Sequence, residues 1–282
     1  LQSRIIAVTM ATSRQGMSVV RHLSSLNLYK IRAITRDTAN RRSLELASLP
    51  NVQVVQGDLL KPESLNNAFK GVYGIFGNTT PTKLLGMDKN YELIQGYNLI
   101  KAVKAIKQSG HLKHFIFSSI CKGKNNRNNI EAPAHFLTKW ELEKEIKNNN
   151  LSEITTILRP ASYFENFTNS LPGVKISYNY FPGILNPNSP WQTIAVDDIG
   201  LWTSTAFTHT KDFINRSLNL AGEELTGNQM AKILQSLQLN RNKKNAKYLK
   251  IPRNFLSIIE NDIAIMAHWI EEVGYGADLN EL

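Results

Sequence analysis

Short apolar runs rich in β-branched residues alternate with helix-like segments through the first 120 residues. The runs are apolar throughout instead of alternating with polar residues, which is typical of parallel strands buried on both faces. Alternation at this spacing predicts βαβ units joined by right-handed crossovers. Five strands are expected in this part of the chain, over residues 4–9, 29–35, 52–55, 72–76 and 114–118.

The helices between and after these strands complete the predicted architecture. They are expected over residues 17–23, 43–49, 62–69, 91–109, 136–148, 194–208 and 263–272, with a sixth strand over 154–158. Residues 169–190 are rich in Pro, Gly and Asn, which favours loops. We expect an α/β fold with a Rossmann-type doubly wound parallel sheet in residues 1–160. A smaller loop- and helix-rich C-terminal lobe in residues 161–282 shares the cleft and returns elements to the core.

Composition narrows the class of protein. With 282 residues, 42% of them hydrophobic, the chain has enough apolar side chains for a sizeable core. It lacks a run of 18 apolar residues, so we expect no membrane span. A single cysteine, Cys121, cannot form an internal disulfide and fits a reducing compartment, the cytoplasm or the nucleus. The six histidines form no cluster with Cys or acidic residues, so no metal site is expected.

The chain is strongly basic, with a formal net charge of +10. Lysines and arginines concentrate in residues 101–124 and 241–253. A positive field attracts polyanions, including nucleic acid and phosphorylated cofactors. Neither segment has the interleaved aromatic residues or the modules of a nucleic-acid binder. We therefore do not expect direct nucleic-acid binding, and solvated helix faces and loops explain the charge as well.

The first strand-to-helix turn departs from the dinucleotide-binding pattern. Three glycines usually shape this turn, and the corresponding positions are Met10, Ser13 and Gly16. The helix that follows still offers N–H groups and a positive dipole end for a phosphate. Methionine at position 10 would oppose close approach if that position needs a positive φ angle. The turn therefore leaves two alternatives open, a retained or a lost dinucleotide site.

Other polar residues lie where the predicted strands end. Arg36 follows the second strand, where a basic residue suits the 2′-phosphate of NADP and an acidic residue suits the free hydroxyl of NAD. Asp58 follows the third strand, and Asn78 and Thr79 follow the fourth. These residues would face adenine and ribose, although Asp and Asn also favour turns for local reasons. NADP is thus preferred over NAD.

In order and spacing, several short motifs resemble the NmrA-like family, an atypical branch of the short-chain dehydrogenase/reductase superfamily. The resemblance covers nearly the whole chain, and its most specific part lies between Ala134 and Asn166. The motifs are Ala11–Gly16, Thr35-Arg36, Gly57-Asp58-Leu59, Ala134-His135-Phe136 with Lys139, Arg159-Pro160, Tyr163-Phe-Glu-Asn166 and Val196–Gly200.

The resemblance implies a protein that binds NADP(H), or NAD, in its N-terminal half. Members of the family act mostly as redox sensors and in transcriptional regulation through protein partners such as transcription factors. Residues 122–129 and the basic C-terminal segment are the candidate partner surfaces. Carried over by position, the cofactor contacts are Thr12, Ser13, Arg14, Gln15, Arg36, Asp58, Asn78, Thr79, Lys139, Tyr163, Phe164, Glu165 and Asn166.

The catalytic pair of the wider superfamily is only half present. Active members use Tyr-x-x-x-Lys, in which lysine lowers the pKa of the tyrosine that exchanges a proton with substrate. Here His135 takes the tyrosine position and Lys139 remains. We expect Lys139 to bind the cofactor ribose, the alternative being an exposed helix lysine. A non-catalytic protein is preferred. The alternative is an NADPH-dependent reductase of quinones or small carbonyls that takes a proton from His135, Tyr163, Tyr178 or Tyr180.

Overall fold

The structure, a computed structural model, describes residues 4–80, 90–123, 126, 128–169, 180–238 and 247–280. The chain divides into two units, and each unit takes three segments of it. The first unit comprises Leu1–Ile120, Thr138–Arg159 and Val196–Leu218, and the second comprises Cys121–Leu137, Pro160–Ala195 and Asn219–Leu282. One passage of the chain between the units lies between Arg159 and Pro160. A single boundary at residue 160 would place residues 121–137 in the first unit and residues 196–218 in the second. In the structure, residues 121–137 belong to the second unit and residues 196–218 to the first.

The first unit is built on a seven-stranded sheet with the order β10-β6-β5-β4-β1-β2-β3. All the pairs recorded among β1 to β6 are parallel. The order reverses between β1 and β4, which makes their carboxyl ends the switch point where ligands bind in such sheets. The strands are β1 (Ile5–Val8), β2 (Lys30–Thr35), β3 (Val52–Gln56), β4 (Gly74–Gly77), β5 (His114–Ser118), β6 (Thr155–Pro160) and β10 (Arg216–Leu220).

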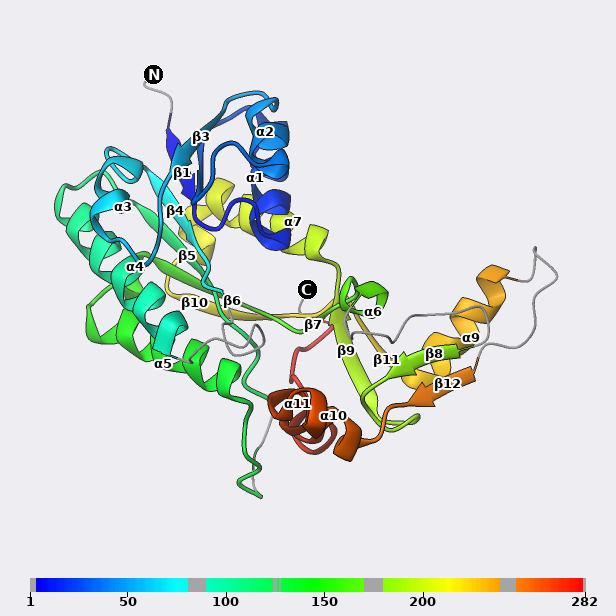
Figure 1. Cartoon of the computed structure of the whole chain (residues 1–282). Helices are drawn as coiled ribbons and strands as arrows, with labels where there is room; N and C mark the ends of the chain where they lie inside the picture. The colour runs from blue at the N-terminus through cyan, green and yellow to red at the C-terminus, as the bar shows by residue number, and fades with distance from the viewer. Residues whose placement is uncertain are drawn as a thin grey trace. The chain divides into compact units, whose positions relative to one another are not determined.

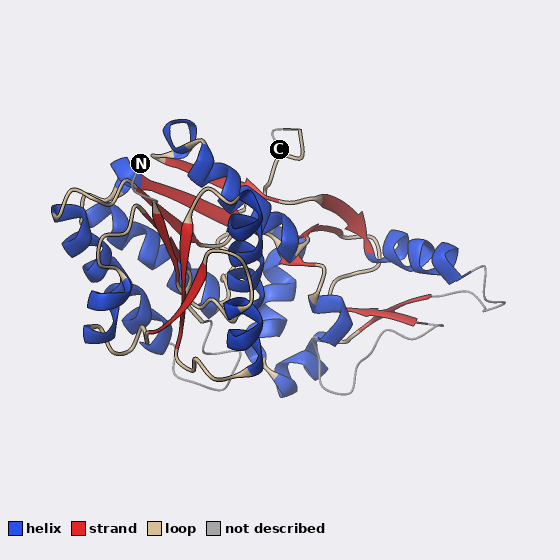
Figure 2. Cartoon of the chain, turned by 90° about the horizontal axis from the view of Figure 1, so that it is seen from above, coloured by secondary structure: helices blue, strands red, loops and turns tan. Residues whose placement is uncertain are grey.

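Helices cover both faces of this sheet (Figures 1 and 2). One face carries α1 (Arg14–Leu26), α2 (Arg41–Ala47) and α7 (Val196–Thr208). The other carries α3 (Glu63–Ala68), α4 (Asn90–Gln108) and α5 (Ala134–Asn148). A short 3-10 helix, Ser152–Ile154, precedes β6, and α8 (Thr210–Phe213) follows α7. The predicted doubly wound α/β fold is confirmed.

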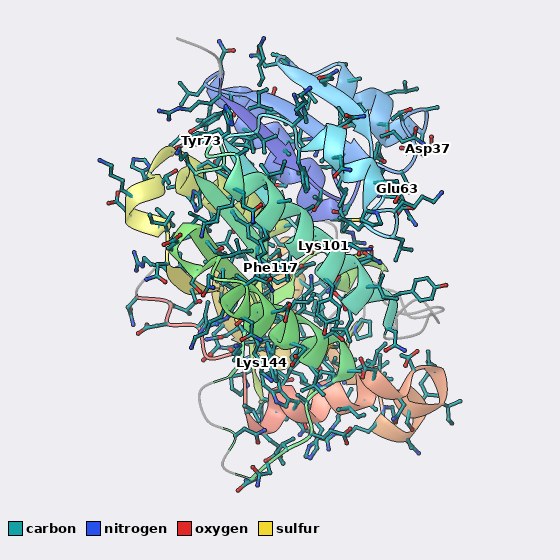
Figure 3. The ribbon with its side chains drawn as sticks, turned by 90° about the vertical axis from the view of Figure 1, so that its left-hand side faces the viewer. Asp37, Glu63, Tyr73, Lys101, Phe117 and Lys144 are labelled. Carbon is teal, nitrogen blue, oxygen red and sulfur yellow. The ribbon has the colours of Figure 1, made fainter. Side chains whose placement is uncertain are left out.

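Apolar residues of the strands form the core of the first unit. Phe115 and Phe117 of β5 are fully buried beneath α4 and α5. Lys101 on α4 and Lys144 on α5 point outward in Figure 3, where the two helices lie in front of β5. The helices approach closely, because a Cβ on Gly96 of α4 would lie 2.2 Å from the Leu142 side chain of α5. Tight packing of this kind fixes where α5 presents its polar residues.

The second unit contains two small sheets, with the orders β11-β9-β7 and β12-β8. Its aromatic core includes Phe136, Trp269 and Tyr275, whose rings are in mutual contact. The strands are β7 (Ser162–Tyr163), β8 (Tyr180–Gly183), β9 (Pro190–Ile194), β11 (Glu223–Thr226) and β12 (Lys247–Lys250). The helices are α6 (Asn166–Asn169), α9 (Gly227–Gln238), α10 (Arg253–Ile259) and α11 (Asn261–Glu272).

The sequence prediction is wrong about strands in the C-terminal part. Residues 180–183 form β8 inside the segment expected to be loop, and β10, β11 and β12 lie within residues 161–282, which were expected to be rich in loops and helices. The helix expected over 194–208 begins at Val196, because Ile194 ends β9. These strands are short and pair with segments distant in sequence, so their local pattern is weak.

Two absences hold for the described residues. No helix among them combines the length and the apolar character needed to cross a membrane. No group of three or more His, Cys, Asp or Glu side chains among them is placed to hold a metal ion.

Candidate functional site

The turn from β1 to α1 stays tight despite its lost glycines. Met10 adopts a left-handed φ of 50°, so this position does need the conformation that glycine adopts without strain. The Ser13 hydroxyl accepts a hydrogen bond from the Gly16 amide at 3.1 Å and caps α1. A Cβ on Gly16 would lie 2.2 Å from the Met10 carbonyl oxygen. Methionine therefore tolerates position 10 at a cost of about 1–2 kcal/mol, whereas position 16 needs glycine.

A pocket opens beside this turn at the carboxyl ends of β1, β2 and β3. Arg36 is exposed at the end of β2, and Asp58 is half-buried after β3. Arg42 of α2 donates a hydrogen bond from Nη1 to the Thr12 carbonyl at 3.0 Å, which brings a second guanidinium to the loop. The lining residues are Thr9, Met10, Thr12, Ile34, Thr35, Arg36, Gly57, Asp58, Leu59, Leu60, Thr80 and Gln95.

The chemistry of this pocket suits a phosphorylated nucleotide. Guanidinium groups pair with phosphate oxygens, and the N-terminus of α1 adds the positive end of a helix dipole. Asp58 has a local role as well, since its Oδ1 accepts a hydrogen bond from the Leu60 amide at 3.0 Å. Asp58 therefore stabilises its own turn, as the alternative to a binding role predicted. It also lines the pocket, so the two roles are compatible.

A second group of polar residues gathers at the carboxyl end of β4. Asn78 donates from Nδ2 to Gln15 Oε1 of α1 at 3.1 Å. The Thr9 hydroxyl, at the end of β1, accepts a hydrogen bond from the Asn78 amide at 3.0 Å. These bonds join β1, α1 and β4 at the switch point of the sheet. Arg14, another predicted contact, is exposed in the first turn of α1.

Lys139 joins this group from α5 and is buried, with 8% of its surface exposed. Its ammonium donates to Thr79 Oγ1 at 2.8 Å, Asn78 Oδ1 at 3.0 Å and the Ser118 carbonyl at 3.1 Å. The alternative of an exposed helix lysine is therefore wrong. A longer hydrogen bond to the Thr79 carbonyl, at 3.4 Å, adds a fourth acceptor, so Lys139 is held at the ends of β4 and β5.

His135 lies in the second unit and has a buried carboxylate partner. Its Nδ1 forms a 2.5 Å hydrogen bond with Asp262 Oδ2. Asp262 Oδ1 accepts a further hydrogen bond from the Ala134 amide at 2.7 Å. The carboxylate thus satisfies an amide at the start of α5 and fixes the histidine ring. A partner of this kind holds Nδ1 in one hydrogen-bonding role.

The remaining predicted contacts, Tyr163 to Asn166, also belong to the second unit. Tyr163 ends β7 and pairs with Ile194 of β9, and the Phe164 amide donates to the Ile194 carbonyl at 3.0 Å. Asn166 is exposed and begins α6. Tyr180 begins β8. Tyr178, one of the proton donors weighed for a reductase, lies outside the described residues.

Sequence reasoning missed three charged residues near the predicted ones. Arg42 could have been noticed as a second arginine shortly after the β2 strand. Glu92, in the first turn of α4, is 3.5 Å from the Lys139 ammonium and is buried. Asp262 has no local signal that pairs it with His135. The last two acquire their partners only through long-range packing.

A sequence comparison matches residues 2–281 to the NmrA-like family. Among curated relatives, an oxidoreductase named notA′ from Aspergillus versicolor is 38% identical over 117 residues, 41% of this chain and 32% of that protein. An oxidoreductase named FrzB from Cladobotryum is 30% identical over 188 residues, 63% of this chain and 52% of that protein. The chain thus spans about a third to a half of these relatives. A Dictyostelium discoideum family protein is 25% identical over 98% of the chain and 91% of its own length.

Solved structures share the fold at lower identity. NmrA, a negative transcriptional regulator in complex with NADP, has a TM-score of 0.76 and 22% identity, over all of this chain and 90% of that one. The NADPH-dependent quinone oxidoreductase QOR2 of Escherichia coli has a TM-score of 0.75 and 20% identity, over 98% and 92% of the two chains. Since the family match extends over nearly every residue, the chain belongs to the NmrA-like family.

Proposed function

We propose that this protein binds NADP(H) in its first unit and acts as a nucleotide-sensing regulatory protein. The observation that carries the proposal is the pocket at the carboxyl ends of β1 to β3, rimmed by Arg36 and Asp58. Solved relatives of the same fold were crystallised with NADP, NAD or NADPH. The residues present fit such a dinucleotide: α1 and its turn would hold the pyrophosphate, and Asp58 a hydroxyl or amine. When bound, the nicotinamide supplies hydride chemistry.

The preference for NADP over NAD rests on two guanidinium groups. Arg36 lines the pocket, and Arg42 reaches the Thr12 carbonyl beside it. Arginine pairs with phosphate in a bidentate manner, and each such pair is stronger than a neutral hydrogen bond. A 2′-phosphate therefore gains from these cations, while the free ribose hydroxyl of NAD gains little.

The preference for a regulator over a dehydrogenase rests on the two positions that correspond to the catalytic Tyr-x-x-x-Lys pair, His135 and Lys139. His135 stands in place of the tyrosine that active members of the superfamily use. The Lys139 ammonium donates hydrogen bonds to oxygens of Asn78, Thr79 and Ser118. A protein partner in the cytoplasm or nucleus, such as a transcription factor, would bind this protein differently according to which nucleotide it holds. One solved structure of similar fold is described as a negative transcriptional regulator.

Calorimetric titration of NADPH, NADP and NAD into the purified protein tests the proposal. We expect NADP(H) to bind more tightly than NAD. Arg36→Glu should weaken NADP binding by about tenfold to hundredfold, because it removes a charge-assisted pair, and should leave NAD binding nearly unchanged. Lys30→Glu, at an exposed position at the start of β2, is the control for charge alone. Equal losses for both nucleotides, or no binding of any, would contradict the proposal.

A reductase is the second candidate, favoured by the relatives named oxidoreductases. One solved structure of similar fold is a triphenylmethane reductase of Citrobacter complexed with NADP(H). In such a reaction His135 would be the proton donor available on α5. Oxidation of NADPH by the wild-type protein with a quinone or a triphenylmethane dye, lost in His135→Ala, would establish this function and overturn the non-catalytic one.

A further inference from the structure

Glu92 and Lys139 form a buried ion pair inside the first unit. The Lys139 ammonium lies 3.5 Å from Glu92 Oε1, and only 1% of the Glu92 surface is exposed. The Thr79 hydroxyl links the two, since it donates to Glu92 Oε1 at 2.9 Å and accepts from Lys139 at 2.8 Å. Two opposite charges thus share one hydroxyl at the end of β4.

The carboxylate offsets part of the cost of burying the ammonium. Burial lowers the pKa of Lys139, and the charge of Glu92 acts against that shift. The other groups recorded against the ammonium are uncharged, namely the Asn78, Thr79 and Ser118 oxygens and the ring of Phe117. Among the described residues, Glu92 is therefore the charged group that favours the ammonium form of Lys139.

The helix that carries Glu92 adds to this arrangement. Glu92 lies in the first turn of α4, where the positive end of the helix dipole stabilises a carboxylate. The Thr80 amide donates to Gln95 Oε1 of the same helix at 3.1 Å, which ties the chain after β4 to α4. The start of α4 is thus anchored beside Lys139 by two separate contacts.

We propose that Glu92 is a positioning residue for the dinucleotide site: it holds the Lys139 ammonium in place, so that Lys139 can exchange hydrogen bonds to Asn78 and Thr79 for hydrogen bonds to the ribose hydroxyls of the nicotinamide nucleotide. The inference rests on the proposed NADP(H) binding and assigns a role to a residue outside the pocket lining. Without the carboxylate, Lys139 would lose its proton more readily and would donate fewer, weaker hydrogen bonds.

A ligand-free measurement tests the first half of this inference. Since the pKa of Lys139 in the folded state lies below its unfolded value, the unfolded chain binds more protons, and stability rises with pH in that range. Glu92→Gln should lower the folded pKa further, so the pH range below the unfolded value of about 10.4 over which its unfolding free energy rises should extend to lower pH than in the wild type. The rise in unfolding free energy should be absent in the double variant Glu92→Gln/Lys139→Met. The control is Glu141→Gln, which removes an exposed ion pair with Lys144 on α5 and should give the wild-type pH dependence.

Titration of NADP tests the second half. Glu92→Gln should weaken binding by about tenfold to hundredfold, the loss growing as the pH rises, while Glu92→Asp recovers part of it and Glu141→Gln has no effect. If Glu92→Gln binds NADP like the wild type, the positioning role is wrong. If the wild type binds no dinucleotide, the proposed function fails and the ribose role with it. The pH signature then decides separately whether Glu92 keeps Lys139 charged.

Discussion

Gly16 is the residue on which the turn from β1 to α1 closes. Its Cα faces the backbone of Met10 and Ala11, where a Cβ would lie 2.2 Å from one oxygen and 2.7 Å from a Cα. Backbone atoms cannot move aside as a side chain can. Met10, in contrast, needs only an uncommon φ angle, which costs about 1–2 kcal/mol without a collision. This difference explains why two glycines of the pattern are dispensable and the third is not.

Gly16→Ala should therefore destabilise the protein by about 1–3 kcal/mol, the range for forcing extra atoms into a packed site. It should also reduce NADP binding, because the turn must open to admit the methyl group. Urea unfolding and calorimetric titration measure the two effects. Ser25→Ala, on the exposed end of α1, is the control and should change stability by less than about 0.5 kcal/mol. A Gly16→Ala protein with wild-type stability would contradict the close approach.

His114 gives a second prediction for a single residue. It is buried in β5 and hydrogen-bonds Thr156 at 2.7 Å and Thr210 at 3.2 Å. Burial lowers its pKa to about 4, so the folded state holds it neutral while the unfolded state takes up a proton below about pH 6.5. The contribution of neutral His114 to the free energy of unfolding is therefore complete above about pH 6.5. That contribution, on the order of 3 kcal/mol, is lost as the pH falls toward 4.

The lowered pKa of His114 is tested by measuring the free energy of unfolding from about pH 7 to about pH 4 for the wild type and for His114→Asn. The wild type should lose more stability than the variant over that interval. His111→Asn removes an exposed histidine and should follow the wild-type curve. Parallel curves for the wild type and His114→Asn would rule out a depressed pKa at this position.

At the scale of elements, the contact of α4 with α5 decides where Lys139 meets its partners. Gly96 faces the side chain of Leu142, which is fully buried. Gly96→Ala should cost about 1–3 kcal/mol from overpacking, and Leu142→Ala about 2–5 kcal/mol from the cavity it leaves. In the double variant, the methyl group added at position 96 fills part of the cavity left by Leu142. The double variant should therefore lose less unfolding free energy than the sum of the losses in the two single variants. Simple additivity in urea unfolding would mean that the helices do not touch there.

Elements also show what sequence can and cannot predict. The strands of the large sheet are continuous apolar runs such as Ile5–Val8, whose burial on both faces leaves a local signal. By contrast, β8 and β12 pair with each other across more than 60 residues, and Lys247–Lys250 has charged ends that no strand pattern favours. Asp262 and Glu92 acquire their roles in the same way, through partners far along the chain.

The pocket residues were easier to predict because parallel strands bring their carboxyl ends to one edge of the sheet. Arg36 and Asp58 follow neighbouring strands, so strand positions alone predict their proximity. The backbone of Met10 was not predictable, since propensities disfavour a left-handed methionine and tertiary packing imposes it. For the same reason the burial of Lys139 became evident only from the packing of α5.

At the scale of the whole molecule, the first unit depends on a segment that comes late in the chain. α7 packs on α1, where a Cβ on Gly200 would lie 2.2 Å from Ser18 Oγ. Tyr29 donates its hydroxyl hydrogen bond to the Phe207 carbonyl at 3.1 Å, and the Phe207 ring lies against Gly74 of β4. One face of the large sheet is therefore incomplete without residues 196–218.

A fragment of residues 1–160 should consequently fail to fold cooperatively, although it contains six of the seven strands of that sheet. We expect a broad urea transition and binding of a hydrophobic dye, as for a compact state without fixed packing. A fragment of residues 1–218 should recover a steeper transition. A sharp, single unfolding transition in the shorter fragment would contradict the dependence on α7.

The alternation of segments between the two units has a consequence for synthesis on the ribosome. The N-terminal strands emerge from the exit tunnel first, but α7 and β10 emerge only after residue 195 has been translated. At about 5–20 residues per second, the nascent sheet waits several seconds with one face only partly covered. During that interval its apolar strands are exposed to chaperones, and slower translation of residues 160–195 would prolong the exposure.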